Sequence, residues 1–524
     1  MSGPVAMPPS PDILPRLLAL MPLSARHVLI SGTDRLVSAY HARNPKARIT
    51  RWPSGGGEGP FDLILLDGSA GDIDPARAVP DLAARLAPGG HLVAAFGNDR
   101  HHARMVAGAA RGHALHARDL VGLITGAGLT MRRMRSPEPA LPETASGNHP
   151  DAGPATQDHP RAPCHFTVAM RAIPGQPVRR PMRFHMCELA PHMDVRTRVP
   201  AAALAAEPDL FVTRSGSPLI LPDLGPGGGV VLVQRPRMTD PEVMLGYVAA
   251  SQQRGIIVVI EYDDDPRLVS RVLRRKDVPE SYDRVISMAH AVQTSTGLLG
   301  DQFRRINPEL AVFGNMARDL PPMRTHRPGP MRVLMGALNR SRTDALAAAL
   351  DPAIAAMPET RFEVIRDTRF FDALPTRNKR LHDLQPYPQY LNLMRHCDIC
   401  LMPLEGRPEE LAKSDVKWVE AASRGAVAVA SPAVYEATIR DGENGFLARE
   451  PGDWSRLLIA LGRDAALRGR VAGTARAEVA ETRMLAGQIA TRRDWYLGLM
   501  ARRAAIFAAT RARNPDLAAR LAAG

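Results

Sequence analysis

Short apolar runs alternate with helical stretches along most of the 524-residue chain, and this alternation limits the possible folds more than any other feature. Runs such as Val230–Gln234 and Gly255–Glu261 are typical of parallel strands that are buried on both faces. Parallel strands need a crossover connection, usually a helix, so strands that alternate with helices predict an α/β fold. At about 100–200 residues per domain, the length predicts three or four domains.

Residues 1–175 are predicted to form a Rossmann-like domain. Helical stretches are expected at Asp81–Ala87, which Pro88-Gly89-Gly90 would end, and at Asp119–Ala127. Residues 136–162 are rich in Pro, Gly, Asp and His without periodicity, which predicts a loop. The expected strands are His27–Ser31, Phe61–Asp67, His91–Phe96, Leu129–Arg135 and His165–Ala172.

Two further Rossmann-like halves are predicted over residues 182–325 and 331–524, after an interdomain linker at Pro174–Pro181. The Pro-rich segment Asp319–Pro330 separates the two halves. From about residue 464 the sequence is helical to the end, with one charged face and one Ala/Leu face. The expected strands are Val230–Gln234, Gly255–Glu261, Ala291–Ser295, Leu310–Phe313, Met331–Gly336, Arg361–Ile365, Cys397–Met402 and Ala426–Ala430.

The composition argues against several classes of protein. Lys and Arg number 67 against 54 Asp and Glu, which gives a net charge of +13. The arginines are spread along the chain and only 5% of residues are aromatic, so no nucleic-acid partner is expected. No run approaches the roughly 20 apolar residues that span a bilayer, and four cysteines do not predict a disulfide framework. We expect a cytoplasmic protein, and basic segments such as Arg274-Arg275-Lys276 leave a peripheral membrane contact open.

The strongest signal for a binding site is the segment Leu411–Gly425, LAKSDVKWVEAASRG. The chain has only five lysines against 62 arginines, and two of these five are Lys413 and Lys417. A lysine kept against such a bias indicates a need for a compact ammonium group. The segment follows the apolar run CDICLMPL, so its start is expected outside the carboxyl edge of a parallel sheet, where α/β folds bind ligands.

This segment is predicted to be a helix that Ser414 or Asp415 caps and the final glycine ends. If the helix reaches back to Lys413, then Lys413, Lys417 and Glu420 share one face. A helix N-terminus with two lysines is suited to binding phosphate. The alternative is an ordinary amphipathic helix with a solvated Lys–Glu pair.

The sequence continues with AVAVASPAVYEATIRDGENGFLA, which predicts a buried strand, a short helix, a turn and a closing apolar segment. Together the two segments resemble the nucleotide-sugar half of retaining, family 4-type glycosyltransferases with the GT-B fold. The resemblance is greatest to bacterial members that build O-antigen and other surface polysaccharides. It implies a nucleotide-sugar donor of unknown base, no required cofactor or metal, and a glycan or lipid-linked acceptor.

The resemblance also assigns roles to single residues. Glu420 corresponds to the glutamate that grips the donor ribose, and Lys413 and Lys417 correspond to the basic groups that face the diphosphate. Ala412 stands where many family members carry another glutamate that contacts the donor sugar, so the sugar stays open. The implied donor-binding residues are Gly336, Asn339, Arg340, Lys413, Ser414, Lys417 and Glu420.

Three adjacent carboxylates, Asp263-Asp264-Asp265, follow the predicted strand Gly255–Glu261. The resembling family usually presents a polar residue to the reacting sugar at this place, which makes Asp263 and Asp264 the candidate catalytic residues. They could orient an acceptor hydroxyl or bind a basic loop. The alternative is a cluster that caps the following helix, because Asp before Pro is a common helix start.

Residues 1–175 resemble the class I SAM-dependent methyltransferase fold through FDLILLD, LAARLAPGGHLVAAFGN and HARDLVGLITGAGL. That family holds SAM with a Gly-rich turn after the first strand, because glycine lets the backbone approach the ligand closely. Here the turn is SGTD, with one glycine, and Arg51 stands near the position of the expected acidic residue. A degenerate domain without its cofactor site is predicted, and residual SAM binding through Gly32, Asp34 and Asp67 is the alternative.

The whole sequence predicts an α/β protein, in which a Rossmann-like, methyltransferase-like domain precedes two Rossmann-like halves of a GT-B fold and a helical C-terminus. The predicted function is retaining transfer of a sugar from a nucleotide sugar to a glycan or lipid-linked acceptor, in surface polysaccharide synthesis. Two alternatives stay open. One is a non-catalytic scaffold of polysaccharide assembly, and the other is a bifunctional enzyme that also methylates.

Overall fold

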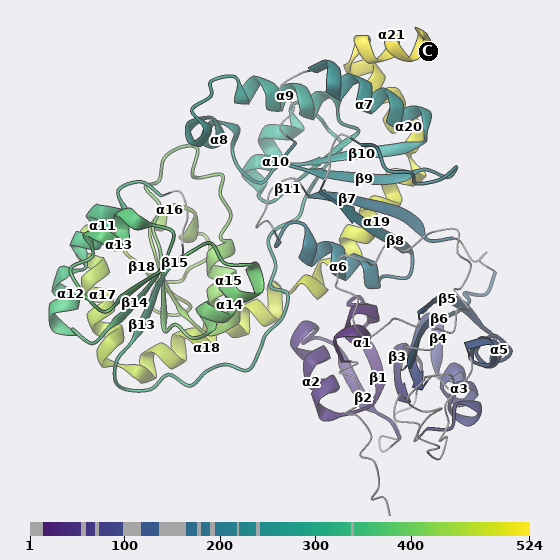
Figure 1. The fold of residues 1–524 in the computed structure, drawn as a ribbon, viewed down its shortest axis with the longest axis horizontal. Helices are drawn as coiled ribbons and strands as arrows, with labels where there is room; N and C mark the ends of the chain where they lie inside the picture. Colours follow the sequence, from purple (N-terminus) through teal and green to yellow (C-terminus); the bar gives the residue numbers. More distant parts are fainter. Residues whose placement is uncertain are drawn as a thin grey trace, which may run out of the picture. The chain divides into compact units, whose positions relative to one another are not determined.

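A computed structural model confirms the predicted α/β class (Figure 1). Its strands build three six-stranded sheets, and helices follow the third sheet to the C-terminal end. The predicted loop at 136–162 lies outside the described residues. The structure describes residues 14–53, 59–68, 73–97, 117–135, 164–175, 180–188, 194–216, 220–236, 241–336 and 340–523.

Contacts within the chain separate two compact units. The first unit comprises residues 1–184 and 200–213, and the second comprises residues 185–199 and 214–524. The first unit holds the first sheet, and the second unit holds the third sheet and most of the second. All strands that were predicted between residues 230 and 430 therefore belong to one unit.

The first sheet combines four parallel strands with an antiparallel pair at one edge, in the order β2-β1-β3-β4-β6-β5. β6 runs antiparallel to both of its neighbours. The strands are β1 (His27–Ser31), β2 (Arg48–Arg51), β3 (Phe61–Gly68), β4 (Leu86–Gly97), β5 (Leu129–Arg135) and β6 (Cys164–Arg171). The helices are α1 (Leu14–Leu20), α2 (Asp34–Arg43), α3 (Pro75–Ala84) and α5 (Ala117–Gly126).

The helix that was predicted at Asp81–Ala87 lies earlier in the chain, at Pro75–Ala84. Its start is fixed by Asp74, whose side chain accepts a hydrogen bond from the backbone N–H of Ala76 (3.0 Å). Proline at the first helical position supports the same start, because its fixed φ suits a helix and its missing N–H is not needed there.

Pro88-Gly89-Gly90, which was predicted to end that helix, lies inside β4 instead. The strand begins at Leu86, which already pairs with Phe61 of β3. The strands β3 and β4 approach so closely that a Cβ atom at Gly90 would lie 2.7 Å from the carbonyl oxygen of Phe61. Glycine is needed here for close strand packing and not for a helix end.

The second sheet has the order β12-β11-β10-β9-β7-β8, and β9 to β12 are parallel. β9, β10 and β11 are buried at every position, as expected for a sheet covered on both faces. The strands are β7 (Met182–Glu188), β8 (Leu210–Ser215), β9 (Gly229–Gln234), β10 (Ile256–Glu261), β11 (Ala291–Thr294) and β12 (Leu310–Val312). The helices are α6 (Arg198–Ala206), α7 (Pro241–Gln253), α8 (Pro266–Leu273), α9 (Val278–Met288) and α10 (Gly297–Arg304).

The third sheet is parallel throughout, in the order β15-β14-β13-β16-β17-β18. Its strands are β13 (Arg332–Met335), β14 (Arg361–Ile365), β15 (Lys379–His382), β16 (Ile399–Met402), β17 (Val427–Ala430) and β18 (Phe446–Leu447). The helices are α11 (Thr343–Ala349), α12 (Asp351–Ala356), α13 (Thr368–Ala373), α14 (Tyr387–Arg395), α15 (Val416–Arg424), α16 (Pro432–Tyr435), α17 (Pro451–Arg463) and α18 (Ala465–Thr482). We call the part of the second unit around this sheet the third-sheet half, and the other part the second-sheet half.

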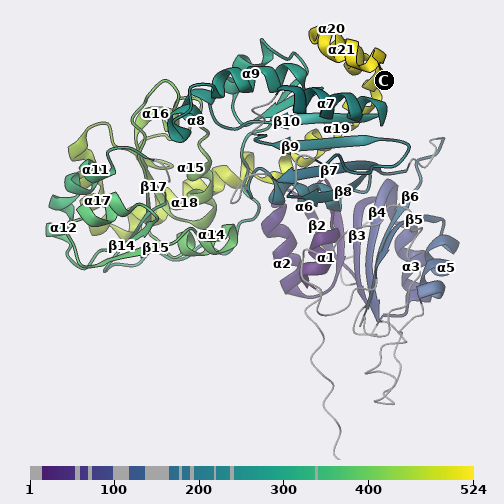
Figure 2. The same cartoon turned by 45° about the horizontal axis from the view of Figure 1, so that its top comes forward.

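The last helices return to the second-sheet half, beside α7 and α9 (Figures 1 and 2). The hydroxyl of Tyr496 donates to the side chain of Gln293 (2.6 Å), and Leu517 is fully buried in the core of this half. The C-terminal segment therefore ties both halves of the second unit together. Its elements are η2 (Leu485–Gly487), α19 (Ile489–Ala501), α20 (Arg503–Arg513) and α21 (Pro515–Ala523).

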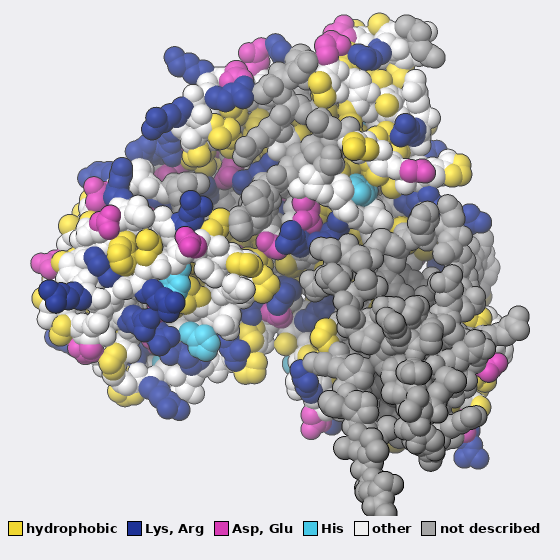
Figure 3. Space-filling view, in the orientation of Figure 1, with side chains coloured by type: hydrophobic (Ala, Val, Ile, Leu, Met, Phe, Trp, Pro, Cys, Tyr) yellow, Lys and Arg dark blue, Asp and Glu magenta, His cyan; other side chains and the backbone are white. Residues whose placement is uncertain are grey.

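The surface of the second unit carries charges of both signs. Basic side chains lie over much of the face drawn in Figure 3, with acidic side chains among them. Among the helices that the structure describes, none is both long enough and apolar enough to cross a membrane.

Candidate active site

The site is built around the residues Lys413–Asp415, which we call the KSD turn, at the start of α15. Asp415 is the N-cap residue, but its side chain does not cap the helix. Its two carboxylate oxygens instead accept hydrogen bonds from Arg483, the C-cap residue that follows α18 (2.6 and 2.7 Å). Gly425 ends the helix in the left-handed conformation, as predicted, with φ of +77°.

The helix begins at Val416, so Lys413 lies in the turn before it. The condition for one helical face with Lys413, Lys417 and Glu420, a helix that reaches back to Lys413, is therefore not met. Only Lys417 and Glu420 lie on the helix, three residues apart, and Lys413 takes its direction from the KSD turn.

Lys417 and Glu420 meet Tyr390 of α14. The ammonium of Lys417 donates to Oε2 of Glu420 (3.0 Å) and to the hydroxyl oxygen of Tyr390 (2.9 Å). The Tyr390 hydroxyl donates to the same Oε2 (3.0 Å). Burial and the nearby Glu420 raise the pKa of Tyr390 well above its ordinary value, so this hydroxyl stays a hydrogen-bond donor.

Lys413 points the other way and pairs with the second-sheet half. Its Nζ lies 3.1 Å from Oδ1 of Asp264. Arg235, directly after β9, bridges Asp263 and Asp264, with 2.6 Å between Nη2 and Oδ2 of Asp264. Burial alone would raise the pKa of Asp264, but Arg235 and Lys413 outweigh burial and lower the pKa. Asp264 is therefore an ionised group that accepts protons poorly.

The helix cap in this cluster is Asp265 alone. Its side chain accepts a hydrogen bond from the backbone N–H of Arg267 (2.8 Å), and it precedes α8 directly. The capping alternative thus applies to the third carboxylate of the run. The carboxylate of Asp263 accepts a hydrogen bond from Arg235, and that of Asp264 accepts hydrogen bonds from Arg235 and Lys413.

Side chains of the second-sheet half hold the KSD turn in place. The hydroxyl of Thr296 donates to the carbonyl oxygen of Ala412 (3.1 Å), and the amide of Asn315 donates to the hydroxyl of Ser414 (2.7 Å). Ala412 itself is fully buried in the core of the second-sheet half. The turn at the start of α15 is therefore a joint between the two halves of this unit.

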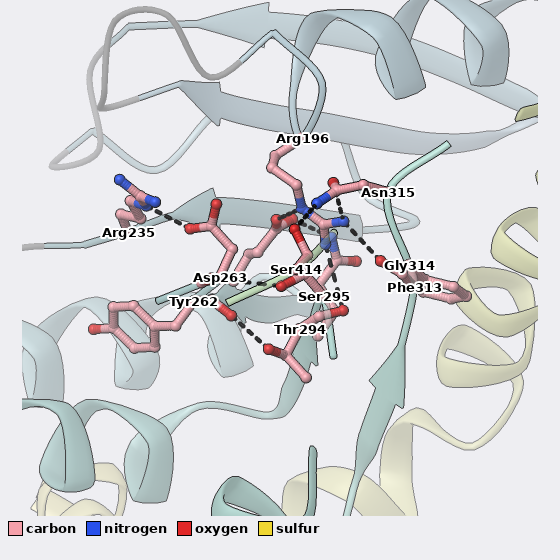
Figure 4. Close-up of polar contacts among 12 residues, drawn as sticks. Arg196, Arg235, Tyr262, Asp263, Thr294, Ser295, Phe313, Gly314, Asn315 and Ser414 are labelled. Atoms are coloured by element: carbon pink, nitrogen blue, oxygen red, sulfur yellow. Dashed lines mark hydrogen bonds and ion pairs between the residues drawn. The ribbon is translucent and has the colours of Figure 1, made fainter. Parts of the chain in front are cut away.

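Asn315 belongs to a buried polar network around Arg196 (Figure 4). Nε of Arg196 donates to Glu261 at the end of β10 (2.5 Å), and its Nη1 donates to Asn315 (3.1 Å) and to the carbonyl of Phe313 (2.7 Å). Glu261 also accepts a hydrogen bond from Gln293 of β11. Both partners of the Arg196–Glu261 pair are fully buried. The network fixes the carboxyl ends of β10 to β12 and, through Asn315, the KSD turn.

The remaining predicted donor residues lie after β13. A Cβ atom at Gly336 would be 3.2 Å from the ring of Tyr390, so this position is packed against the Lys417–Glu420 cluster. Nε of Arg340 donates to the carbonyl of Pro403 (3.0 Å), and its charge is a further cause of the lowered pKa of Asp264. Asn339 lies outside the described residues.

Five of the predicted donor residues thus form two groups. Gly336, Lys417 and Glu420 gather around Tyr390, whereas Lys413 and Ser414 contact the second-sheet half. Among the missed residues, Arg235 had a usable signal, because it follows a predicted strand at the same sheet edge as the acidic run. The residues that the sequence analysis did not single out are Arg196, Arg235, Asn315 and Tyr390.

The described residues offer no group of three or more His, Cys, Asp or Glu side chains placed to hold a metal ion. Positive charge at the site is supplied by side chains, namely Arg235, Arg340, Lys413 and Lys417.

The first unit contains a cavity of about 830 Å³ at the carboxyl ends of β1 and β3. Gly32, with φ of +151°, and Asp67 line this cavity, and both were predicted for a residual SAM site. Asp34 forms an ion pair with Arg51 and is not part of the lining. The other lining residues are Ser31, Thr33, Trp52, Pro53, Ile73, Asp74, Arg77, Ala78 and Asp81.

No protein-family model and no curated protein matches the chain. Solved structures with similar folds include TarM of S. aureus, in complex with fondaparinux, α-GlcNAc-glycerol and UDP. The identity is 12% and the TM-score 0.38, and the match covers 52% of this chain and 56% of TarM. The chain thus spans little more than half the length of that protein.

HepE of Anabaena, in complex with UDP and glucose, matches at 12% identity and a TM-score of 0.42, over 60% of this chain and 99% of HepE. A glycosyltransferase of Rickettsia africae matches at 10% identity and a TM-score of 0.40, over 62% of this chain and 99% of that protein. At these identities and scores, the likeness does not carry an argument about the reaction of this chain.

Proposed function

We propose that the second unit is a glycosyltransferase that moves a sugar from a nucleotide-sugar donor to a glycan or lipid-linked acceptor. One observation carries the proposal. Two lysines at the start of α15 and a buried glutamate on it lie at the carboxyl edge of the third sheet. Asp264 of the other half, which Arg235 holds beside Asp263, reaches Lys413 of the same turn. This arrangement supports a site in which one half binds an anionic donor and the other half holds the acceptor.

The donor side would stabilise the leaving diphosphate. In the transfer, the bond between the anomeric carbon and the phosphate oxygen breaks, and a bond from the acceptor oxygen to that carbon forms. Negative charge builds up on the diphosphate, and Arg340, Lys413, Lys417 and the N-terminus of α15 can offset it. Such charge stabilisation needs no metal ion from the protein, so we propose metal-independent transfer.

The acceptor side would be served by Asp263 and Asp264. Asp264 stays ionised beside Arg235 and Lys413, so it suits the orientation of a hydroxyl better than the removal of its proton. The acceptor proton then passes to a phosphate oxygen of the leaving group. We further propose that transfer proceeds with retention and serves surface polysaccharide synthesis, as in the family that the sequence resembles, at a cytoplasmic site with peripheral membrane contact.

The test is a thermal-shift screen of the full chain with UDP, GDP, ADP, TDP and CMP, followed by calorimetry. Stabilisation by at least one diphosphate is expected, because a ligand that binds only the folded state raises the melting temperature. If none binds, the non-catalytic scaffold becomes the better explanation, and the Lys417–Glu420 pair is then a structural ion pair.

The cavity of the first unit favours a second candidate function, a methyltransferase-like site in addition to the transferase. Its volume of about 830 Å³ falls in the usual range for small-molecule sites, and Gly32 and Asp67 line it. Repeating the screen with and without SAM tests this candidate.

A further inference from the structure

We propose that Tyr390 is a positioning residue of the donor site, which keeps Glu420 fixed for the donor ribose while Lys417 turns to the donor phosphates. The inference rests on the proposed function and concerns the same site. It assigns a role to a residue that the KSD motif does not contain, and it predicts a preference for ribonucleotide donors.

The geometry centres on one carboxylate oxygen. Oε2 of Glu420 accepts hydrogen bonds from Lys417 (3.0 Å) and from Tyr390 (3.0 Å). Lys417 donates to the Tyr390 hydroxyl as well (2.9 Å). Each of the three groups therefore contacts the other two, and removal of one leaves the remaining pair in contact.

This redundancy matters because Glu420 is only 5% exposed. A buried carboxylate without a hydrogen-bond donor is strongly disfavoured. If Lys417 alone held Glu420, a phosphate could recruit the lysine only by leaving that carboxylate unpaired. Because Tyr390 holds the same oxygen, Lys417 can move to a phosphate while Glu420 keeps a donor and its position.

The ring of Tyr390 is itself well fixed. A side chain larger than glycine at position 336 would press on it, since a Cβ atom there lies 3.2 Å from the ring. The ammonium of Lys417 lies 4.4 Å from the ring centre, so the ring also stabilises the lysine in its resting place. Tyr390 thus contacts all three predicted donor residues of this group.

The competing explanation is a buried tyrosine that only supports the fold. The two explanations differ in where the effect of Tyr390→Phe appears. A structural role lowers the melting temperature of the free protein, as the loss of any buried hydrogen bond does. A positioning role weakens nucleotide binding through Glu420, and it changes how well ribose is distinguished from deoxyribose.

The experiment measures dissociation constants of the full chain by calorimetry for UDP, GDP and ADP, and for their 2′-deoxy counterparts. With the base that binds best, Tyr390→Phe and Glu420→Gln are each expected to weaken binding about tenfold, the usual loss for a hydrogen bond to a charged group. The double variant should bind within about twofold of Glu420→Gln, because Tyr390 acts through Glu420. Wild type should prefer the ribonucleotide, and Tyr390→Phe should lose most of that preference.

Tyr40→Phe is the matched control, since Tyr40 is a buried tyrosine of the first unit whose hydroxyl donates to the carbonyl of Pro22 (2.9 Å). It should lose a similar amount of stability and bind nucleotide like wild type. Unchanged binding in Tyr390→Phe, or multiplied losses in the double variant, would overturn the inference and leave the proposed function standing. Equal affinity of wild type for ribonucleotide and deoxyribonucleotide would overturn it without any variant. If wild type binds no nucleotide, the proposed function fails and this inference fails with it.

Discussion

The predicted donor site of the second unit and the alternative SAM site of the first unit lie at the same place in the fold, the carboxyl ends of parallel strands, but the two places differ in what they contain. In the first unit the carboxyl ends of the strands border a cavity of about 830 Å³, and Gly32 and Asp67 are among the residues that line it. In the second unit Lys417 and Glu420 are bonded to each other, and Lys413 is bonded to Asp264. The SGTD turn, the weaker of the two motifs, thus lies at an open cavity. The KSD turn and α15, the stronger motif, carry side chains that are already paired.

The difference follows from the chemistry of the two motifs. Partly buried charges need partners, so a site made of lysines and carboxylates pairs them with each other when no ligand is bound. The turn after β1 carries no paired lysine, and the cavity beside it stays open although charged side chains line it, namely Asp67, Asp74, Arg77 and Asp81. A donor that binds in the second unit must therefore displace the carboxylates that Lys413 and Lys417 contact. A ligand of the first unit enters a space that is already open. The predictions below test this contrast, starting with the largest expected effect.

Replacement of both Asp263 and Asp264 by Asn should reduce turnover by about 10²–10⁴-fold, the usual range for a positioned acid–base or orienting group. Nucleotide affinity should change little, because Glu420 and Lys417 stay in place. Transfer to the native acceptor, or hydrolysis of the donor, is the assay, and thermal unfolding is measured in parallel.

Asp265→Ala provides the matched control for this variant. It removes the helix cap and should cost about 1 kcal/mol of stability with little effect on turnover. If the Asn double variant loses stability and activity in parallel, the acidic run is structural. The catalytic assignment of Asp263 and Asp264 is then wrong.

Lys417→Ala and Glu420→Ala should each weaken nucleoside diphosphate binding about tenfold or more, since a charged hydrogen bond contributes about 1.5–3 kcal/mol. The fold should survive in both. Lys379→Ala is the control, because this lysine of the same half donates to the carbonyls of Phe371 (2.6 Å) and Leu374 (2.9 Å). Calorimetry with UDP, GDP and ADP checks the affinities. Wild-type binding in both site variants would place the nucleotide away from α15.

Local sequence signals predicted the frame of this site. The strands of the second and third sheets that read as apolar runs were predicted within one or two residues, and so was the end of α15 at Gly425. β15, KRLH, was missed because it is an edge strand whose residues are mostly polar and no more than partly buried. The start of α15 was open between two caps, and the Asp415–Arg483 pair could not be read from the local sequence.

The partners of the site residues could not be predicted, because they come from distant parts of the chain. Arg196 lies 65 residues before Glu261, and Tyr390 lies 30 residues before Glu420. Helix and strand periodicities relate only near neighbours, so they cannot pair such positions. A rule that buried charges need partners shows that Glu420 must have one, but only the fold shows which.

Acidification should destabilise the second unit through two buried histidines. Burial lowers the pKa of His185 from 6.5 to about 4, and burial with Arg513 and Arg511 lowers that of His290 to about 3. The unfolded chain therefore binds protons below about pH 6.5 that the folded chain does not, so stability falls as the pH falls. Between pH 7 and pH 6 the expected loss is about 0.7 kcal/mol for each histidine.

Thermal unfolding at the two pH values measures this loss. His185→Gln can still hydrogen-bond to Ser215, which lies 2.9 Å from the His185 ring nitrogen, and it should remove about half of the pH effect. A stability that does not change between pH 7 and pH 6 would mean that neither histidine is buried in the neutral form.

The smallest expected effect is that of SAM on the first unit, and it decides whether the cavity is a working site. The turn after β1 has one glycine, so the backbone cannot approach a ligand as closely as a Gly-rich turn allows. Asp34, one of the three candidate SAM contacts, forms an ion pair with Arg51 and does not line the cavity. Calorimetry of the full chain with SAM should therefore give weak binding or none. A dissociation constant in the low micromolar range that Asp67→Asn abolishes would show the opposite. The cavity would then be a working SAM site, and contacts other than a Gly-rich turn would hold the ligand there. Ligand binding would in that case have been shown first for the site with the weaker motif.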